Sequence, residues 1–135
     1  MITLAILVAG GRTQTNTFAD SSVEVLHLNG TSWCSMPNLD YGRARASMSG
    51  FMICGGATDT GTVNRDNTCS TINSDGTWNE TIFLTKNRYA HSGWQTERGL
   101  MLLGGHTRFS GEPGSTELVS NRQSQATFPL INPSR

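Results

Sequence analysis

The sequence predicts an all-β protein made of short strands and frequent turns. Gly, Ser, Thr and Asn supply 56 of the 135 residues, a composition that favours turns and short strands over long helices. Apolar segments of four to six residues alternate with clusters of Gly, Asn, Asp and Ser, which is the pattern of strands separated by turns. With 36% hydrophobic residues and a formal net charge of zero, the chain has the composition of a globular unit.

An internal repeat is the strongest feature of the sequence. Three apolar runs each end in a glycine pair, and the pairs lie 45 and 49 residues apart. Each of the first two pairs is followed by a Trp after 22 residues and by an Arg ten residues later. The third copy is weaker, because Thr127 stands where a Trp is expected, with Phe128 beside it. The glycine pairs are Gly10-Gly11, Gly55-Gly56 and Gly104-Gly105, and the later landmarks are Trp33, Trp78, Arg43 and Arg88.

Each repeat predicts about four strands. In the second copy we expect strands over residues 44–48, 51–54, 68–72 and 77–83. The runs before the glycine pairs show no alternation of apolar and polar residues, which predicts strands covered on both faces. A glycine pair ending such a strand indicates positive φ or a close backbone approach.

These features resemble the kelch repeat, whose marks are a glycine pair after an apolar strand, a Glu in the third strand, a later Trp and about 50 residues per unit. Glu24, Glu117 and His91 match it in addition to the glycines, tryptophans and arginines above. The resemblance implies two to three four-stranded antiparallel blades of a β-propeller, over about 1–40 (incomplete), 41–86 and 87–131. A generic β-sandwich is the alternative. The chain is also similar to secreted, cysteine-bearing kelch-like proteins of invertebrates, related in fold to the galactose oxidase propeller.

Propellers close with about four to eight blades. Fewer than three would leave open sheet faces and unpaired edges, so we expect missing blades or another chain to close the ring. The first eight residues fit a strand better than a signal peptide, so any export signal is expected upstream.

The three cysteines cannot all pair within the chain. Cys54 ends the predicted second strand and Cys69 lies in the third strand of the same blade, so we expect a disulfide between them, with buried thiols as the alternative. The bridge would close a loop of about 15 residues, worth about 3 kcal/mol. Cys34 would then pair with a cysteine outside these residues.

No catalytic constellation is visible, and we expect no enzyme activity, metal or cofactor. His27, His91 and His106 lack the short spacing of a metal motif. Tyr41 and Tyr89 each lie close to a repeat Arg, which favours packing over copper ligation. There is no Gly-x-Ser-x-Gly elbow. The zero net charge gives no basis for nucleic-acid binding, and the longest apolar run, six residues, is too short to span a membrane.

The loops after the glycine pairs are the expected binding surface, because propeller rims carry ligand contacts. An ordinary solvated loop is the alternative. Candidate partner-binding residues are Arg12, Asp20, Asp59, Arg65, Asp66, His106, Arg108 and Glu112. Asn29 and Asn79 begin glycosylation sequons.

The sequence therefore predicts a noncatalytic, extracellular scaffold that binds a protein or a glycan. Two alternatives remain open. One is the propeller platform of a carbohydrate oxidase-like enzyme, and the other is an intracellular kelch adaptor with reduced cysteines in the cytoplasm.

Overall fold

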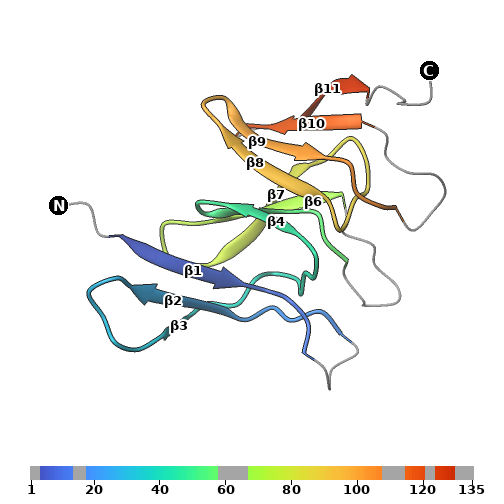
Figure 1. Ribbon diagram of the computed structural model, residues 1–135. Helices are drawn as coiled ribbons and strands as arrows, with labels where there is room; N and C mark the ends of the chain where they lie inside the picture. Colours follow the sequence, from blue (N-terminus) through green and yellow to red (C-terminus); the bar gives the residue numbers. More distant parts are fainter. Residues whose placement is uncertain (1–3, 14–17, 58–66, 108–114, 121–123, 130–135) are drawn as a thin grey trace.

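The computed structural model describes residues 4–13, 18–57, 67–107, 115–120 and 124–129, of which 115 and 124–129 are described by their backbone. The described chain is all-β, with eleven strands in three antiparallel sheets (Figure 1). Sheet 1 consists of β1 (Ala5–Ala9), β2 (Val23–His27) and β3 (Cys34–Met36). Sheet 2 consists of β4 (Ser47–Ser49), β5 (Met52–Cys54), β6 (Thr68–Ile72) and β7 (Trp78–Phe83). Sheet 3 consists of β8 (Ser92–Thr96), β9 (Gly99–Leu103), β10 (Ser115–Val119) and β11 (Ser124–Pro129).

Each sheet is a meander in which consecutive strands are neighbours. The sheets follow one another in chain order from the lower left to the upper right of Figure 1. The three glycine pairs end β1, β5 and β9, so they belong to three different sheets rather than to one. Among the described residues, none forms a helix with the length and apolar character that a membrane crossing requires.

Ladder registers make the repeats equivalent residue by residue. Val8, Ile53 and Leu102 each lie two residues before a glycine pair. Their cross-strand partners are Glu24, Ser70 and Glu117 respectively. These three partners therefore occupy one structural position in the three sheets.

Two apolar layers join the sheets. Between sheets 1 and 2, Val23, Leu39, Ile53 and Trp78 form a buried cluster, with Leu7 and Ala9 packed against it. The second cluster lies between sheets 2 and 3 and contains Met52, Cys54, Cys69, Ile82, Leu84, Leu100, Leu102 and Val119. Sheet 2 is thus covered on both faces.

Two strand predictions need correction. The strand expected over 44–48 begins only at Ser47, and Ala44 forms an isolated bridge with Ala57. The reason is Arg45, whose φ of 59° interrupts the extended backbone. Coverage of both faces holds for β5, whose three residues are all buried, but is wrong for β1, where Ile6 and Val8 are exposed.

Candidate functional site

The first two glycine pairs connect their sheet to the next one. All six glycines have φ between 64° and 109°, which is the first of the two alternatives that the sequence left open. The first glycine bonds within its own sheet, since Gly10 N–H donates to Ser22 O and Gly55 N–H donates to Thr68 O, both at 2.9 Å. The second glycine reaches the following repeat: Gly11 N–H donates to Arg43 O at 2.7 Å, and Gly56 N–H donates to Arg88 O at 2.9 Å.

The side chains of the same two arginines form hydrogen bonds within their own sheet. Arg43 Nη1 donates to Gly55 O at 2.9 Å, and Arg88 Nη1 donates to Gly104 O at 2.8 Å. The arginines are 1% and 0% exposed. Arg43 and Arg88 each contact the preceding sheet through the backbone carbonyl and their own sheet through the guanidinium group. We call this arrangement the arginine staple.

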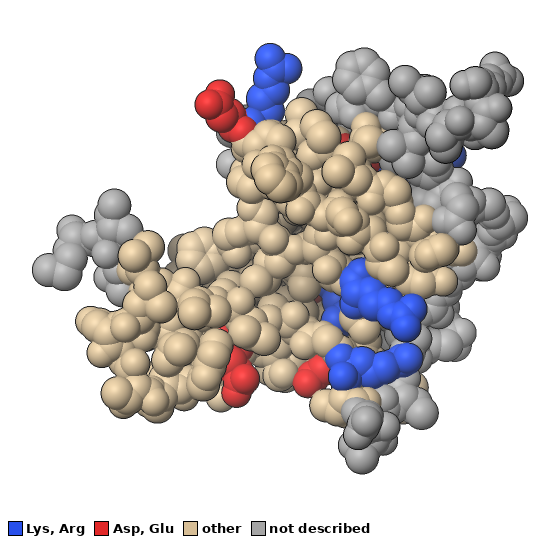
Figure 2. Space-filling view, viewed as in Figure 1, with Lys and Arg blue, Asp and Glu red and all other residues tan. Residues whose placement is uncertain are grey.

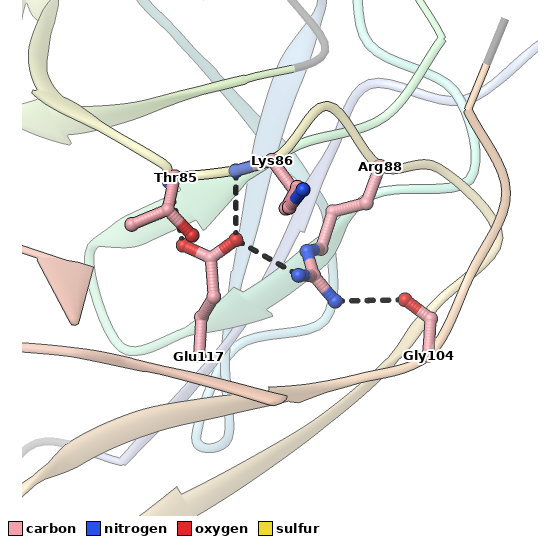
Figure 3. Close-up of polar contacts among 5 residues, drawn as sticks. All are labelled: Thr85, Lys86, Arg88, Gly104 and Glu117. Carbon is pink, nitrogen blue, oxygen red and sulfur yellow. Dashed lines mark hydrogen bonds and ion pairs between the residues drawn. The ribbon is translucent and has the colours of Figure 1, made fainter. Parts of the chain in front are cut away.

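In sheet 3 the staple is completed by Glu117 on β10 (Figure 3). Its carboxylate accepts from Arg88 Nη2 at 2.8 Å, and both side chains are fully buried. The same carboxylate accepts from the backbone N–H of Thr85 at 2.8 Å and of Lys86 at 3.0 Å. Multiple hydrogen bonds are what a buried ion pair requires, because each charge loses its hydration.

In sheet 2 the carboxylate comes from a different residue. Ser70 occupies the position of Glu117, and its hydroxyl donates to Asp40 Oδ1 at 2.6 Å. The same Asp40 oxygen accepts from Tyr41 N–H at 3.1 Å. Since Asp40 and Thr85 both lie three residues before a staple arginine, the carboxylate and the hydroxyl have exchanged positions between the repeats. Arg43 Nη2 donates to Ser70 Oγ at 2.9 Å and to Thr68 Oγ1 at 2.8 Å.

After each staple the chain makes a left-handed turn before its first strand begins. Arg45 and Ala90 lie two residues after Arg43 and Arg88 and have φ values of 59° and 52°. Ala90 N–H donates to Arg45 O at 2.9 Å, so the two turns are bonded to each other. An L-residue in this region costs about 1–2 kcal/mol, and its recurrence indicates that the packing requires this turn.

His91 lies between sheets 2 and 3. A β-carbon added to Gly55 would meet His91 Cε1 at 2.7 Å, and one added to Gly105 would meet His91 Cβ at 2.9 Å. Burial of the ring lowers the pKa of His91 to about 4; the charge of Arg88 acts in the same direction, and that of Glu117 opposes it. The ring is therefore neutral at pH 7.

The structure contains the Cys54–Cys69 disulfide, between directly paired residues of β5 and β6. Both cysteines are fully buried, in the cluster between sheets 2 and 3. The bridge therefore lies in the core, while Cys34 is an exposed free thiol.

The predicted partner-binding residues are only partly described. Arg12 is exposed next to Gly11. His106 is exposed, exchanges backbone hydrogen bonds with Tyr89 and has its ring 5.8 Å from the Tyr89 ring. The carboxylate of Asp20 accepts hydrogen bonds from the backbone N–H and the hydroxyl of Ser22. These bonds hold the pKa of the Asp20 carboxyl below its usual 3.8. Asp59, Arg65, Asp66, Arg108 and Glu112 lie outside the described residues.

The remaining predicted residues separate into exposed and buried positions. Asn29 lies in the turn after β2 and Asn79 lies in β7, and both are exposed. Trp78 is 3% exposed, whereas Trp33 is 46% exposed. His27, at the end of β2, is exposed.

A hollow of about 560 Å³ lies between sheets 2 and 3 at the other end of β5 from the glycine pair. Its walls include Ser49, Phe51, Gln95 and Leu100. None of the described residues that line it is charged, so these residues offer apolar packing and hydrogen bonds from Ser49, Thr71 and Gln95. Across the described part of the chain, no group of three His, Cys, Asp or Glu side chains is placed to hold a metal ion.

Sequence reasoning missed Asp40, Ser70 and the paired left-handed turns. When the first two repeats are aligned at a spacing of 45 residues, Asp40 aligns with Thr85 and Arg45 aligns with Ala90. The left-handed turns could not be predicted from the sequence, because neither Arg nor Ala favours positive φ. No protein-family model matches the chain, and no curated protein is similar enough to count as a relative.

Proposed function

We propose that the chain is part of a kelch-type β-propeller that acts as a noncatalytic binding scaffold outside the cell. The observation that carries this proposal is the arginine staple, repeated at Arg43 and Arg88 with equivalent carbonyl acceptors. Buried polar groups in both repeats serve to hold one sheet against the next. Chemistry of this kind suits a rigid platform whose ligands bind to its loops.

Close packing of the first strands favours a propeller over a sandwich. A β-carbon added to Gly93 in β8 would lie 2.6 Å from Ser47 Cβ in β4, so the two first strands approach closely. Ser49 and Gln95, further along the same strands, also contact each other through their side chains. In a propeller, the first strands of adjacent blades lie next to each other around the axis.

The disulfide favours an extracellular location over a cytoplasmic adaptor, because reducing compartments keep most thiols free. The sequons agree with this, since Asn29 and Asn79 are both exposed. If the natural protein instead carried Cys54 and Cys69 as free thiols, the adaptor would become the better interpretation. Mass spectrometry with and without reduction distinguishes the two.

We assign ligand binding to the end of the molecule that carries the glycine pairs. Arg12, Arg45 and Lys86 are exposed there, each within two residues of a glycine pair or a staple arginine. Figure 2 shows basic side chains gathered toward the lower right, while most of this face is uncharged. The proposed partner is a protein or glycan that presents acidic groups to these cations.

A glycan array with neutral, sialylated and sulfated sugars, together with a panel of acidic extracellular proteins, tests the assignment. We expect at least one probe to bind with an affinity that falls with added salt. Replacing Arg12, Arg45 and Lys86 by Ala should weaken that binding. Arg98→Ala, in the exposed turn between β8 and β9, is the matched control and should leave it unchanged.

Copper-dependent peroxide production from sugars or alcohols would contradict the scaffold and favour the oxidase platform. Binding that is lost equally in the Arg98→Ala variant would contradict the assignment to the glycine-pair end. Melting temperatures of all the variants establish that a loss of binding does not reflect unfolding.

A further inference from the structure

The outer face of sheet 1, which points away from sheet 2, is exposed where its counterpart in sheet 3 is buried. The ladder registers make Ile6 and Val8 of β1 equivalent to Leu100 and Leu102 of β9. Leu100 and Leu102 are 1% and 0% exposed, because they pack against sheet 2. Ile6 and Val8 are 46% and 48% exposed. The apolar side chains of an interface are therefore present on sheet 1.

The glutamate position of the staple is likewise exposed in sheet 1 and buried in sheet 3. Glu24 is equivalent to Glu117, which is fully buried and paired with Arg88. Glu24 itself is exposed, between its ladder partners Val8 of β1 and Ser35 of β3. A carboxylate at this position forms a charge-assisted bond with an arginine in sheet 3.

The edge of sheet 1 differs in the same way. β5 is paired on one side with β4, and β9 is paired on the same side with β8. β1 occupies the place of β5 and β9 but, among the residues that the structure describes, forms the edge of its sheet. An edge strand presents unpaired N–H and C=O groups, which are a template for adding a strand.

We propose that sheet 1 is a docking site for an extended polypeptide segment that carries an arginine four residues before a β-strand. The strand adds antiparallel to the free edge of β1, and the guanidinium forms an ion pair with Glu24. This spacing is taken from the chain itself: Arg43 precedes β4 by four residues and Arg88 precedes β8 by four. The site is distinct from the ligand end proposed above, and neither proposal depends on the other.

The occupant is a segment from outside residues 1–135 rather than a second folded copy of this chain. The two segments of this pattern among the described residues are already paired with β5 and β9, and both arginines are buried in their own staples. A second copy would have to unfold one of its own sheets to supply the strand. A separate extended segment has no such requirement and gains both the backbone bonds and the ion pair.

A synthetic peptide with the sequence of residues 85–96 is the probe, because it carries Arg88 and the whole of β8. It is titrated into the ¹⁵N-labelled 135-residue chain while amide shifts and amide exchange are followed. We expect saturable binding, with shifts concentrated in β1 and slower exchange of its edge amides. Glu24→Gln in the chain, or R88A in the peptide, should each weaken binding by at least about tenfold.

Glu97→Gln is the matched control, since Glu97 is an exposed glutamate in the turn between β8 and β9. It should bind the peptide like the wild type. Combining Glu24→Arg in the chain with R88E in the peptide should restore binding, which a merely structural role of Glu24 would not produce. The R88A peptide keeps the test valid if a Glu24 variant is unstable.

Three outcomes would overturn the proposal. The first is no binding of the peptide to β1, and the second is equal binding by the wild type and the Glu24→Gln variant. The third is dimerisation of the chain through β1, seen by light scattering and abolished by Glu24→Gln, which would make a second copy the occupant.

Discussion

His91 occupies a position between sheets 2 and 3 in which its charged form is disfavoured. Both ring nitrogens are buried without a hydrogen-bond partner. The pKa of His91 is about 4 in the folded protein, against 6.5 for an unperturbed histidine. Below pH 6.5 the unfolded chain therefore binds more protons at this residue than the folded chain does. Stability is lost as the pH falls from 6.5 towards 4.

We predict that His91→Ala removes this part of the pH dependence. Ala46 stands at the equivalent position of the preceding repeat, so the repeat accommodates alanine there. Between pH 7 and pH 5, His91 should cost the wild type about 2 kcal/mol of unfolding free energy, and the variant should not show this loss. Urea titrations at the two pH values measure it. Equal losses in both proteins would contradict the prediction; Asp20 and Asp75 titrate below pH 3.8, outside the window.

Gly55 and Gly104 have nearly the same φ but different surroundings. Comparing alanine substitutions at the two positions therefore separates the cost of backbone strain from the cost of disturbing an interface. Gly55 and Gly104 have φ values of 64° and 65°. A β-carbon on Gly55 would lie 2.5 Å from Arg88 O, whereas one on Gly104 would meet nothing within 4 Å. Both alanine substitutions cost about 1–2 kcal/mol through φ. The Gly55 substitution also disturbs the contact between sheets 2 and 3.

We expect Gly55→Ala to reduce the free energy of unfolding by about 2 kcal/mol more than Gly104→Ala does, the usual cost of overpacking. Chemical denaturation of both variants at pH 7 measures the difference. Equal destabilisation would mean that the backbone at Gly55 moves away from Arg88 without cost.

At the level of elements, the repeats conserve an arrangement of hydrogen bonds rather than a residue. The carboxylate near the staple comes from β10 in sheet 3 and from the segment before Arg43 in sheet 2. The exchange of Asp40/Ser70 for Thr85/Glu117 keeps one carboxylate and one hydroxyl in each repeat. Two carboxylates in one buried site would repel each other and lose hydration.

This exchange gives a testable prediction. Ser70→Glu alone places a second carboxylate beside Asp40 and should destabilise the protein by about 3 kcal/mol. Adding Asp40→Thr reproduces the pair found in sheet 3 and should recover more than half of that loss. Urea unfolding of the two single variants and the double variant measures the coupling. Additive effects would show that the two positions are energetically independent.

The alternation of apolar segments with turn residues predicted most strands, and the glycine pairs predicted either positive φ or a close backbone approach, because these features depend on local sequence. The Cys54–Cys69 bridge was also expected, since adjacent strands bring those residues together. The staple was not predicted. Its bonds join residues 12 to 32 positions apart, and Arg43 has the same sequence pattern whether its side chain is buried or solvated. Exposure of the outer face of sheet 1 depends on what lies next to it, which apolar patterning does not encode.

At the scale of the whole molecule, the three sheets differ in how much of their surface is covered. Sheet 2 contacts sheet 1 through one apolar cluster and sheet 3 through the other. In the described part of the chain, sheet 1 is packed on one face and has β1 at its edge. Local stability follows burial and packing, so the sheets should not be equally stable.

We predict that native-state amide exchange follows this order. Amides of β5 and β6, in the doubly covered sheet with its buried disulfide, should exchange most slowly. Amides of β1 that bond to β2 should exchange at least about tenfold faster, because opening sheet 1 breaks only one interface. Reducing the disulfide should destabilise sheet 2 by up to about 3 kcal/mol and so reduce the difference in exchange rate between β1 and the strands β5 and β6. Uniform protection across all three sheets would show instead that the staples and clusters make the chain a single cooperative unit, in which sheet 1 opens only when the whole molecule unfolds.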